Sequence, residues 1–118
     1  MQKYSMEEVS GNGSRIRYTF EETNSKGERV AFDLTHCTNP GGAHSLPERW
    51  RARGWTDRVL QSWIGVDTYV TDRAGDCRRA YDPTVDESQR VIDFRFMLED
   101  TPANRARLIA EIARRAFG

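Results

Sequence analysis

Cysteine, lysine and long apolar runs are all scarce in this chain. Two cysteines among 118 residues are too few for a disulfide framework. No apolar run approaches the roughly 20 residues that a membrane-spanning helix needs. The formal net charge is zero, so no strong overall field draws the chain toward nucleic acid or an anionic membrane. These absences argue against a disulfide-stapled protein, a membrane protein and a binder driven by net charge.

What is present is the composition of a compact domain. The chain is 37% hydrophobic and 31% charged, and its 118 residues are enough to bury a core in one domain. Acidic residues stand near the N-terminus where a signal peptide would carry its apolar core, which predicts a cytoplasmic protein with reduced thiols. We expect residues 1–13 to form a flexible tail and residues 14–118 to form a single α+β domain.

Two hairpins and a further strand are predicted from alternation of apolar and polar side chains. Residues 14–34 alternate on both sides of a turn at Asn24–Gly27. Residues 63–70 form another alternating segment, and the chain returns after a turn as a strand over residues 76–81. Residues 90–96 alternate in the same way and predict a fifth strand.

Two helices are predicted between and after these strands. A short helix is predicted to follow Ser45 or Leu46, with Pro47 in its first turn and Gly54 at its end. Thr101 and Pro102 supply the N-cap and the first residue of a longer helix with one apolar stripe. The order β-β-α-β-β-β-α therefore predicts an α+β fold, with an antiparallel sheet of about five strands and a C-terminal helix packed on one face.

The segment Thr35–Ser45 contains both histidines and one of the two cysteines of the chain. His36, Cys37 and His44, together with Cys77, are candidate ligands for a tetrahedral zinc ion. The close pairing of ligands typical of structural zinc sites is missing, and adjacent residues on a strand face opposite sides. We therefore predict no metal site and no cofactor.

The same segment also supports a catalytic hypothesis. Cys37 would be a thiolate nucleophile, His44 its base, and the backbone amides of Gly41 and Gly42 an oxyanion-binding turn. No third residue is placed by the sequence to orient the histidine, so no catalytic residue is assigned. The simpler interpretation of residues 39–42 is a plain turn.

Asp67 is the acid that interrupts an otherwise apolar strand. The aspartates at 72, 76 and 82 border predicted turns, where their side chains bond to the local backbone. A carboxylate on the buried face of a sheet needs a partner. If Asp67 lies on that face, Arg79 or Arg95 is the expected partner.

Arginine supplies 16 of the 18 basic residues, and several arginines stand beside aromatic residues. Protein interfaces favour arginine and tryptophan as anchors, and the planar guanidinium suits bidentate contacts. The predicted partner-binding residues are Arg49, Trp50, Arg53, Trp55, Arg78, Arg79 and Tyr81. A nucleic-acid surface made of the same residues is an alternative, opposed by the zero net charge and by the acids within residues 67–100.

Four stretches of the chain read THCTNPGGAHSLPERWRARGW, GVDTYVTDRAGDC, AYDP and MLEDTPANRARLIAEIARRAF. In this succession, most of the chain from about Gly27 onward resembles small uncharacterised proteins carried by mobile elements and chromosomes of Gram-positive and gut bacteria. No activity or catalytic residue is established for that group, so the resemblance implies no site. It implies a compact intracellular accessory protein that acts on a partner.

The sequence thus predicts a non-enzymatic protein-interaction module, one version of which is an inhibitor of a host system encoded by a phage or mobile element. The alternatives are a small enzyme that depends on cysteine and histidine, and a nucleic-acid-binding protein that uses the arginine and aromatic surface. A protein is the expected partner, a second copy of the chain is a further candidate, and no membrane partner is expected.

Overall fold

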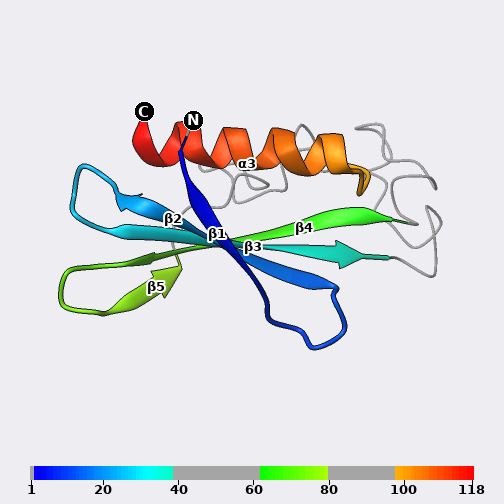
Figure 1. Ribbon diagram of the computed structural model, residues 1–118, viewed down its shortest axis with the longest axis horizontal. Helices are drawn as coiled ribbons and strands as arrows, with labels where there is room; N and C mark the ends of the chain where they lie inside the picture. Colours follow the sequence, from blue (N-terminus) through cyan, green and yellow to red (C-terminus); the bar gives the residue numbers. More distant parts are fainter. Residues whose placement is uncertain (1, 39–61, 80–97) are drawn as a thin grey trace, which may run out of the picture.

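The described part of the chain forms one antiparallel sheet and one long helix (Figure 1). The computed structural model describes residues 2–38, 62–79 and 98–118. The strands pair in chain order, and the helix lies across one face of the sheet. The predicted α+β class, with a C-terminal helix on one face of an antiparallel sheet, is confirmed. The elements are β1 Tyr4–Glu8, β2 Arg15–Thr23, β3 Arg29–Cys37, β4 Trp63–Thr71, β5 Cys77–Arg79 and α3 Pro102–Phe117.

The N-terminal strand corrects one prediction. The sequence predicted a flexible tail over residues 1–13, whereas Tyr4–Glu8 form β1 and pair with β2. Tyr4 stands opposite Phe20, and Met6 stands opposite Tyr18. Two apolar residues among acidic neighbours are a weak alternation signal, so the strand is specified by its pairing and not by its own sequence.

Both predicted hairpins are present, with small differences at their ends. The β2–β3 and β4–β5 turns contain Gly27 and Gly75, whose φ angles of 75° and 89° favour glycine. The returning strand predicted for residues 76–81 is described over Cys77–Arg79. The predicted strand at 90–96 and the predicted short helix after residue 45 lie outside the described residues.

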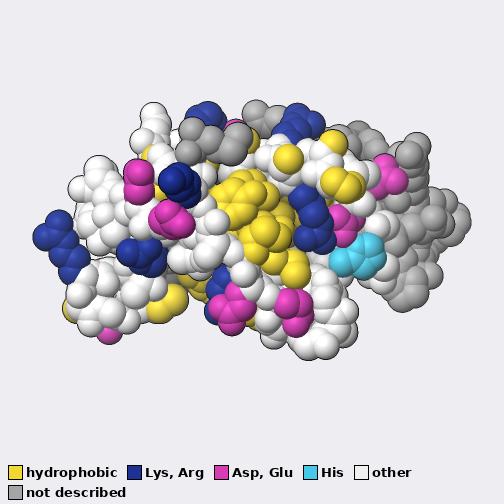
Figure 2. Space-filling view, viewed as in Figure 1, with side chains coloured by type: hydrophobic (Ala, Val, Ile, Leu, Met, Phe, Trp, Pro, Cys, Tyr) yellow, Lys and Arg dark blue, Asp and Glu magenta, His cyan; other side chains and the backbone are white. Residues whose placement is uncertain are grey.

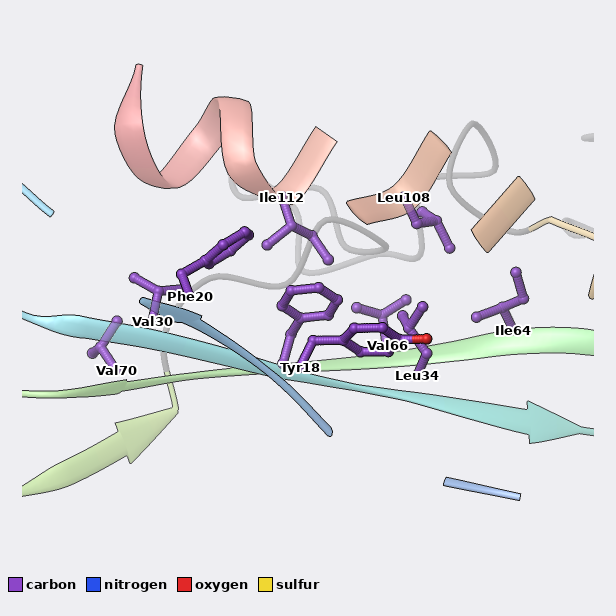
Figure 3. Packing of buried hydrophobic residues seen from close by; sticks show 10 residues of the cluster. Tyr18, Phe20, Val30, Leu34, Ile64, Val66, Val70, Leu108 and Ile112 are labelled. Atoms are coloured by element: carbon purple, nitrogen blue, oxygen red, sulfur yellow. The ribbon is translucent and has the colours of Figure 1, made fainter. Parts of the chain in front are cut away.

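The core lies between α3 and one face of the sheet. Alternate residues of β2, β3 and β4 point toward the helix, as the two-residue period of a strand requires. Figure 3 shows Leu108 and Ile112 reaching down from α3 toward the side chains of the sheet, with Ile112 beside the ring of Phe20. The buried apolar residues are Tyr18, Phe20, Val30, Phe32, Leu34, Ile64, Val66, Val70, Leu108 and Ile112.

Aromatic rings fill much of this core. The rings of Tyr18 and Phe32 are stacked, with centroids 4.9 Å apart and planes 6° from parallel. Phe20 meets Phe117 of α3 edge-on at 5.1 Å, which joins the last turn of the helix to the second strand. Such ring pairs add to the free energy gained from burial alone.

The helix begins as the sequence predicted. Thr101 is the N-cap, and its Oγ1 accepts a hydrogen bond of 3.1 Å from the backbone N–H of Asn104. Pro102 occupies the first turn, where its missing N–H costs no hydrogen bond. Neither α3 nor any other helix in the described ranges is long and apolar enough to cross a bilayer.

Candidate functional site

The sheet face turned away from α3 carries a row of charged residues across four strands. Glu7, Arg17, Asp33 and Asp67 occupy successive register positions on β1 to β4. Arg17 donates from Nε and Nη2 to the two carboxylate oxygens of Asp33, at 2.8 and 3.1 Å. The Asp33 side chain is fully buried, whereas 42% of the Arg17 side chain is exposed. Asp33 raises the pKa of Arg17 through this bidentate pair.

Asp67 lies on this outer face and not among the core residues. Its neighbours Val66 and Thr68 are buried toward the helix, so Asp67 points the other way, opposite Asp33. The condition under which we expected Arg79 or Arg95 as its partner is therefore not met. In the register of the sheet Arg79 stands opposite Tyr69, and residue 95 lies outside the described chain.

His36 and Cys37 lie on opposite faces at the end of β3, as predicted. His36 Nδ1 is 2.6 Å from Asp100 Oδ2, on the side of the sheet that α3 covers. The Cys37 thiol lies on the outer side, 2.9 Å from where a Cβ on Gly65 would stand, and donates a 3.5 Å hydrogen bond to the Thr35 carbonyl. The two side chains cannot act on one substrate atom.

Asp100 connects β3 to the start of α3. Arg105 donates to both oxygens of Asp100, at 2.6 and 2.9 Å, while His36 contacts one of them. Arg105, followed by His36, holds the pKa of Asp100 below its usual range. Because each acid oxygen is already bonded within the protein, this group is best explained as a clamp between a strand end and the helix.

The cysteines do not form a common metal site. Cys37 pairs with Trp63 and Cys77 with Thr71, at the two ends of β4, which places them roughly 25 Å apart along the strand direction. Across the described ranges, no three His, Cys, Asp or Glu side chains come close enough to hold an ion. The fourth candidate ligand, His44, lies outside those ranges.

The thiols differ in a way that iodoacetamide can measure. Burial raises the pKa of the Cys37 thiol, whereas Cys77 is exposed on β5. At pH 7.5 we expect Cys77 to be alkylated in the folded protein and Cys37 to react at least tenfold more slowly, because the thiolate is the nucleophile. Mass spectrometry of the two tryptic peptides over time measures both rates. Cys37 alkylation as fast as that of Cys77 would instead support the catalytic hypothesis.

An apolar groove of about 370 Å³ runs between β1 and α3, and we call it the β1–α3 groove. Its floor is formed by Tyr18 and Phe20 of β2. Figure 2 shows apolar side chains gathered in the middle of this face of the molecule. The strand side is lined by Gln2, Tyr4 and Met6, and the helix side by Pro102, Arg105, Ala106, Ile109, Ala110 and Ala113.

The chemistry of the β1–α3 groove is that of a surface for apolar groups. Met6 is 62% exposed, the large apolar side chain most open to water among the described residues. Small alanines on the helix side let another chain approach the α3 backbone closely. Arg105 also lines the groove but is already bonded to Asp100. The buried Oε1 of Gln2 has no hydrogen-bond partner in the described chain, which leaves one polar group of the lining unsatisfied.

Sequence reasoning did not find this groove. The apolar stripe of α3 was predicted for its core side, but the alanines beside that stripe carry no chemical signature of their own. The groove also needs β1, which was assigned to a tail. Of the predicted partner-binding residues, Arg78 and Arg79 lie on β5, and Arg49, Trp50, Arg53, Trp55 and Tyr81 lie outside the described residues.

Comparison of the chain with protein-family models, with curated proteins and with solved structures finds no match. The function of the chain is therefore inferred from the geometry of the site.

Proposed function

We propose that this protein is a non-enzymatic binding module that holds an apolar segment of a partner protein in the β1–α3 groove. The observation that carries the proposal is the groove itself, with Met6 exposed at its rim and tyrosine and phenylalanine rings at its floor. Apolar surface of this kind, bordered by polar residues, is typical of protein-binding sites.

The chemistry of the described residues gives less support to the two alternatives. An enzyme that uses Cys37 would need a lowered thiol pKa, whereas burial raises it. A nucleic-acid binder would need arginines available to phosphate, whereas four arginines bind carboxylates of the chain itself. These are Arg17 with Asp33, Arg105 with Asp100, and Arg114 and Arg115 with Glu111.

A charge placed inside the groove tests the proposal. We expect Ala110→Glu to reduce recovery of the partner at least tenfold in a pull-down from a nuclease-treated bacterial lysate, because an apolar partner would have to desolvate the carboxylate. Ala110 is exposed on α3 and glutamate is a good helix former, so the fold should be retained. Quantitative mass spectrometry of the bound proteins is the measurement.

The matched control is Ala103→Glu, which adds the same charge to the same helix. Ala103 is exposed and does not line the groove, so this variant should recover the partner as the unmodified protein does. Equal recovery with Ala110→Glu would contradict the proposal. Partner recovered from an untreated lysate but not from a nuclease-treated one would favour the nucleic-acid alternative.

A further inference from the structure

The outer edge of β1 has backbone groups that no described strand pairs with. The ladder to β2 continues through the hydrogen bonds from Glu21 N to Lys3 O and from Val9 N to Arg15 O. In an antiparallel ladder, bonded positions alternate along each strand. The odd-numbered residues of β1 therefore bond to β2, and the N–H and C=O groups of Tyr4, Met6 and Glu8 point outward.

We propose that a second copy of this chain occupies that edge, with the two β1 strands paired antiparallel about a two-fold axis through Ser5. This inference goes beyond the proposed function and does not depend on it. An exposed strand edge is a template for pairing with another chain, and two-fold symmetric dimers are the commonest homo-oligomers.

Two conditions determine how the two β1 strands align: which residues point their backbone groups outward, and which charged side chains meet. Outward-pointing residues must meet outward-pointing residues, so the two-fold axis has to pass through a residue of β1. An axis at Glu7 or Glu8 would place two like charges directly opposite, which is unfavourable. An axis at Ser5 places Lys3 opposite the second copy's Glu7, and Glu7 opposite the second copy's Lys3. Two pairs of opposite charge thus form at once.

The side chains of β1 support the same register. Lys3 and Glu7 are exposed on the outer face of the sheet, where they can meet across the axis. Glu8 is less suited to an intermolecular pair, because its carboxylate already accepts hydrogen bonds from the backbone N–H groups of Ser10, Gly11 and Gly13. Glu7 stands opposite Arg17 in the ladder to β2, and its exposed carboxylate can also meet a lysine on a partner strand.

Apolar contacts would form on the helix side of the same pair. With the axis at Ser5, Tyr4 of each copy stands opposite Met6 of the other. The exposed Met6 side chain is then covered by an aromatic ring, and the two β1–α3 grooves meet across the axis.

Charge reversal and exchange test the proposed pairing. Sedimentation velocity at low salt, over a range of protein concentrations, should show a monomer–dimer equilibrium for the unmodified chain. Lys3→Glu and Glu7→Lys should each weaken the dimer about tenfold or more, because two attractions become two repulsions. The double variant Lys3→Glu/Glu7→Lys should restore the dimer, since the pairs are then exchanged and not lost.

Two further variants separate pairing from general charge and fold effects. Lys26→Glu makes the same charge change at the exposed β2–β3 turn and should leave the dimer unchanged. Met6→Pro removes an outward N–H without touching the ladder to β2, so the dimer should be lost while the thermal midpoint stays close to that of the unmodified chain. A chain that is monomeric at every concentration overturns the proposal, as does a double variant as monomeric as the single ones. Recovery of the groove partner by the monomeric Lys3→Glu protein would show that the proposed function does not require the dimer.

Discussion

Phe32→Ala is expected to lower the free energy of unfolding by about 3–5 kcal/mol. Phe32 is fully buried in the central part of the sheet, stacked on Tyr18 and 5.6 Å from the ring of Phe20. The loss combines the transfer of the ring to water with the cavity that remains. Because domains of this size are stable by about 5–15 kcal/mol, the variant should lose a large fraction of its stability.

Thermal and urea unfolding followed by circular dichroism measure this effect. A loss of this size corresponds to a fall of roughly 10–20 °C in the thermal midpoint. Phe32→Leu is the matched control, because it keeps most of the apolar volume and should cost much less than alanine. Equal stabilities of the alanine and leucine variants would show that the Phe32 ring does not hold the core together.

Arg17→Met is expected to cost about 2–3 kcal/mol, although the residue is nearly half exposed. The cause is Asp33, which is fully buried and would lose both short hydrogen bonds to its carboxylate. Arg15 remains, but its Nη1 is 3.8 Å from the nearer Asp33 oxygen and makes only a loose contact. Arg15→Met, the matched control, should therefore cost less than Arg17→Met.

A double-mutant cycle isolates the interaction between Arg17 and Asp33. In the variant Arg17→Met/Asp33→Leu no buried charge is left without its partner, so stability should recover toward that of the unmodified protein. Urea unfolding of the four proteins gives the coupling energy. If the double variant loses as much stability as the two single variants together, Arg17 does not stabilise the Asp33 carboxylate.

The fold could be predicted to the extent that it is written in local patterns. The hairpin between β2 and β3 follows from strict alternation and from a turn that needs a positive φ at Gly27. The start of α3 follows from Thr101 and Pro102. β1 could not be predicted this way. The alternation of Tyr4 and Met6 is too short to indicate a strand until its pairing with β2 is known.

The candidate site was harder to predict than the fold, for a related physical reason. The opposite orientation of His36 and Cys37 follows from the two-residue period of a strand and was predicted correctly. The groove combines Tyr4 and Met6 with alanines about a hundred positions later in the chain, and alanine carries no functional group. Binding surfaces made of shape and apolar area leave little trace in a single sequence.

The position of α3 after the five described strands has a consequence for biosynthesis. The apolar faces of β2, β3 and β4 are translated before the helix that covers Phe20, Phe32 and Ile64. On the ribosome, a sheet without its cover would expose aromatic surface, which is the property that leads to aggregation and to capture by chaperones. Chains truncated before Pro102 should therefore accumulate as insoluble or chaperone-bound material. The yield of folded protein in cells should depend on how soon α3 is translated and packs on the sheet.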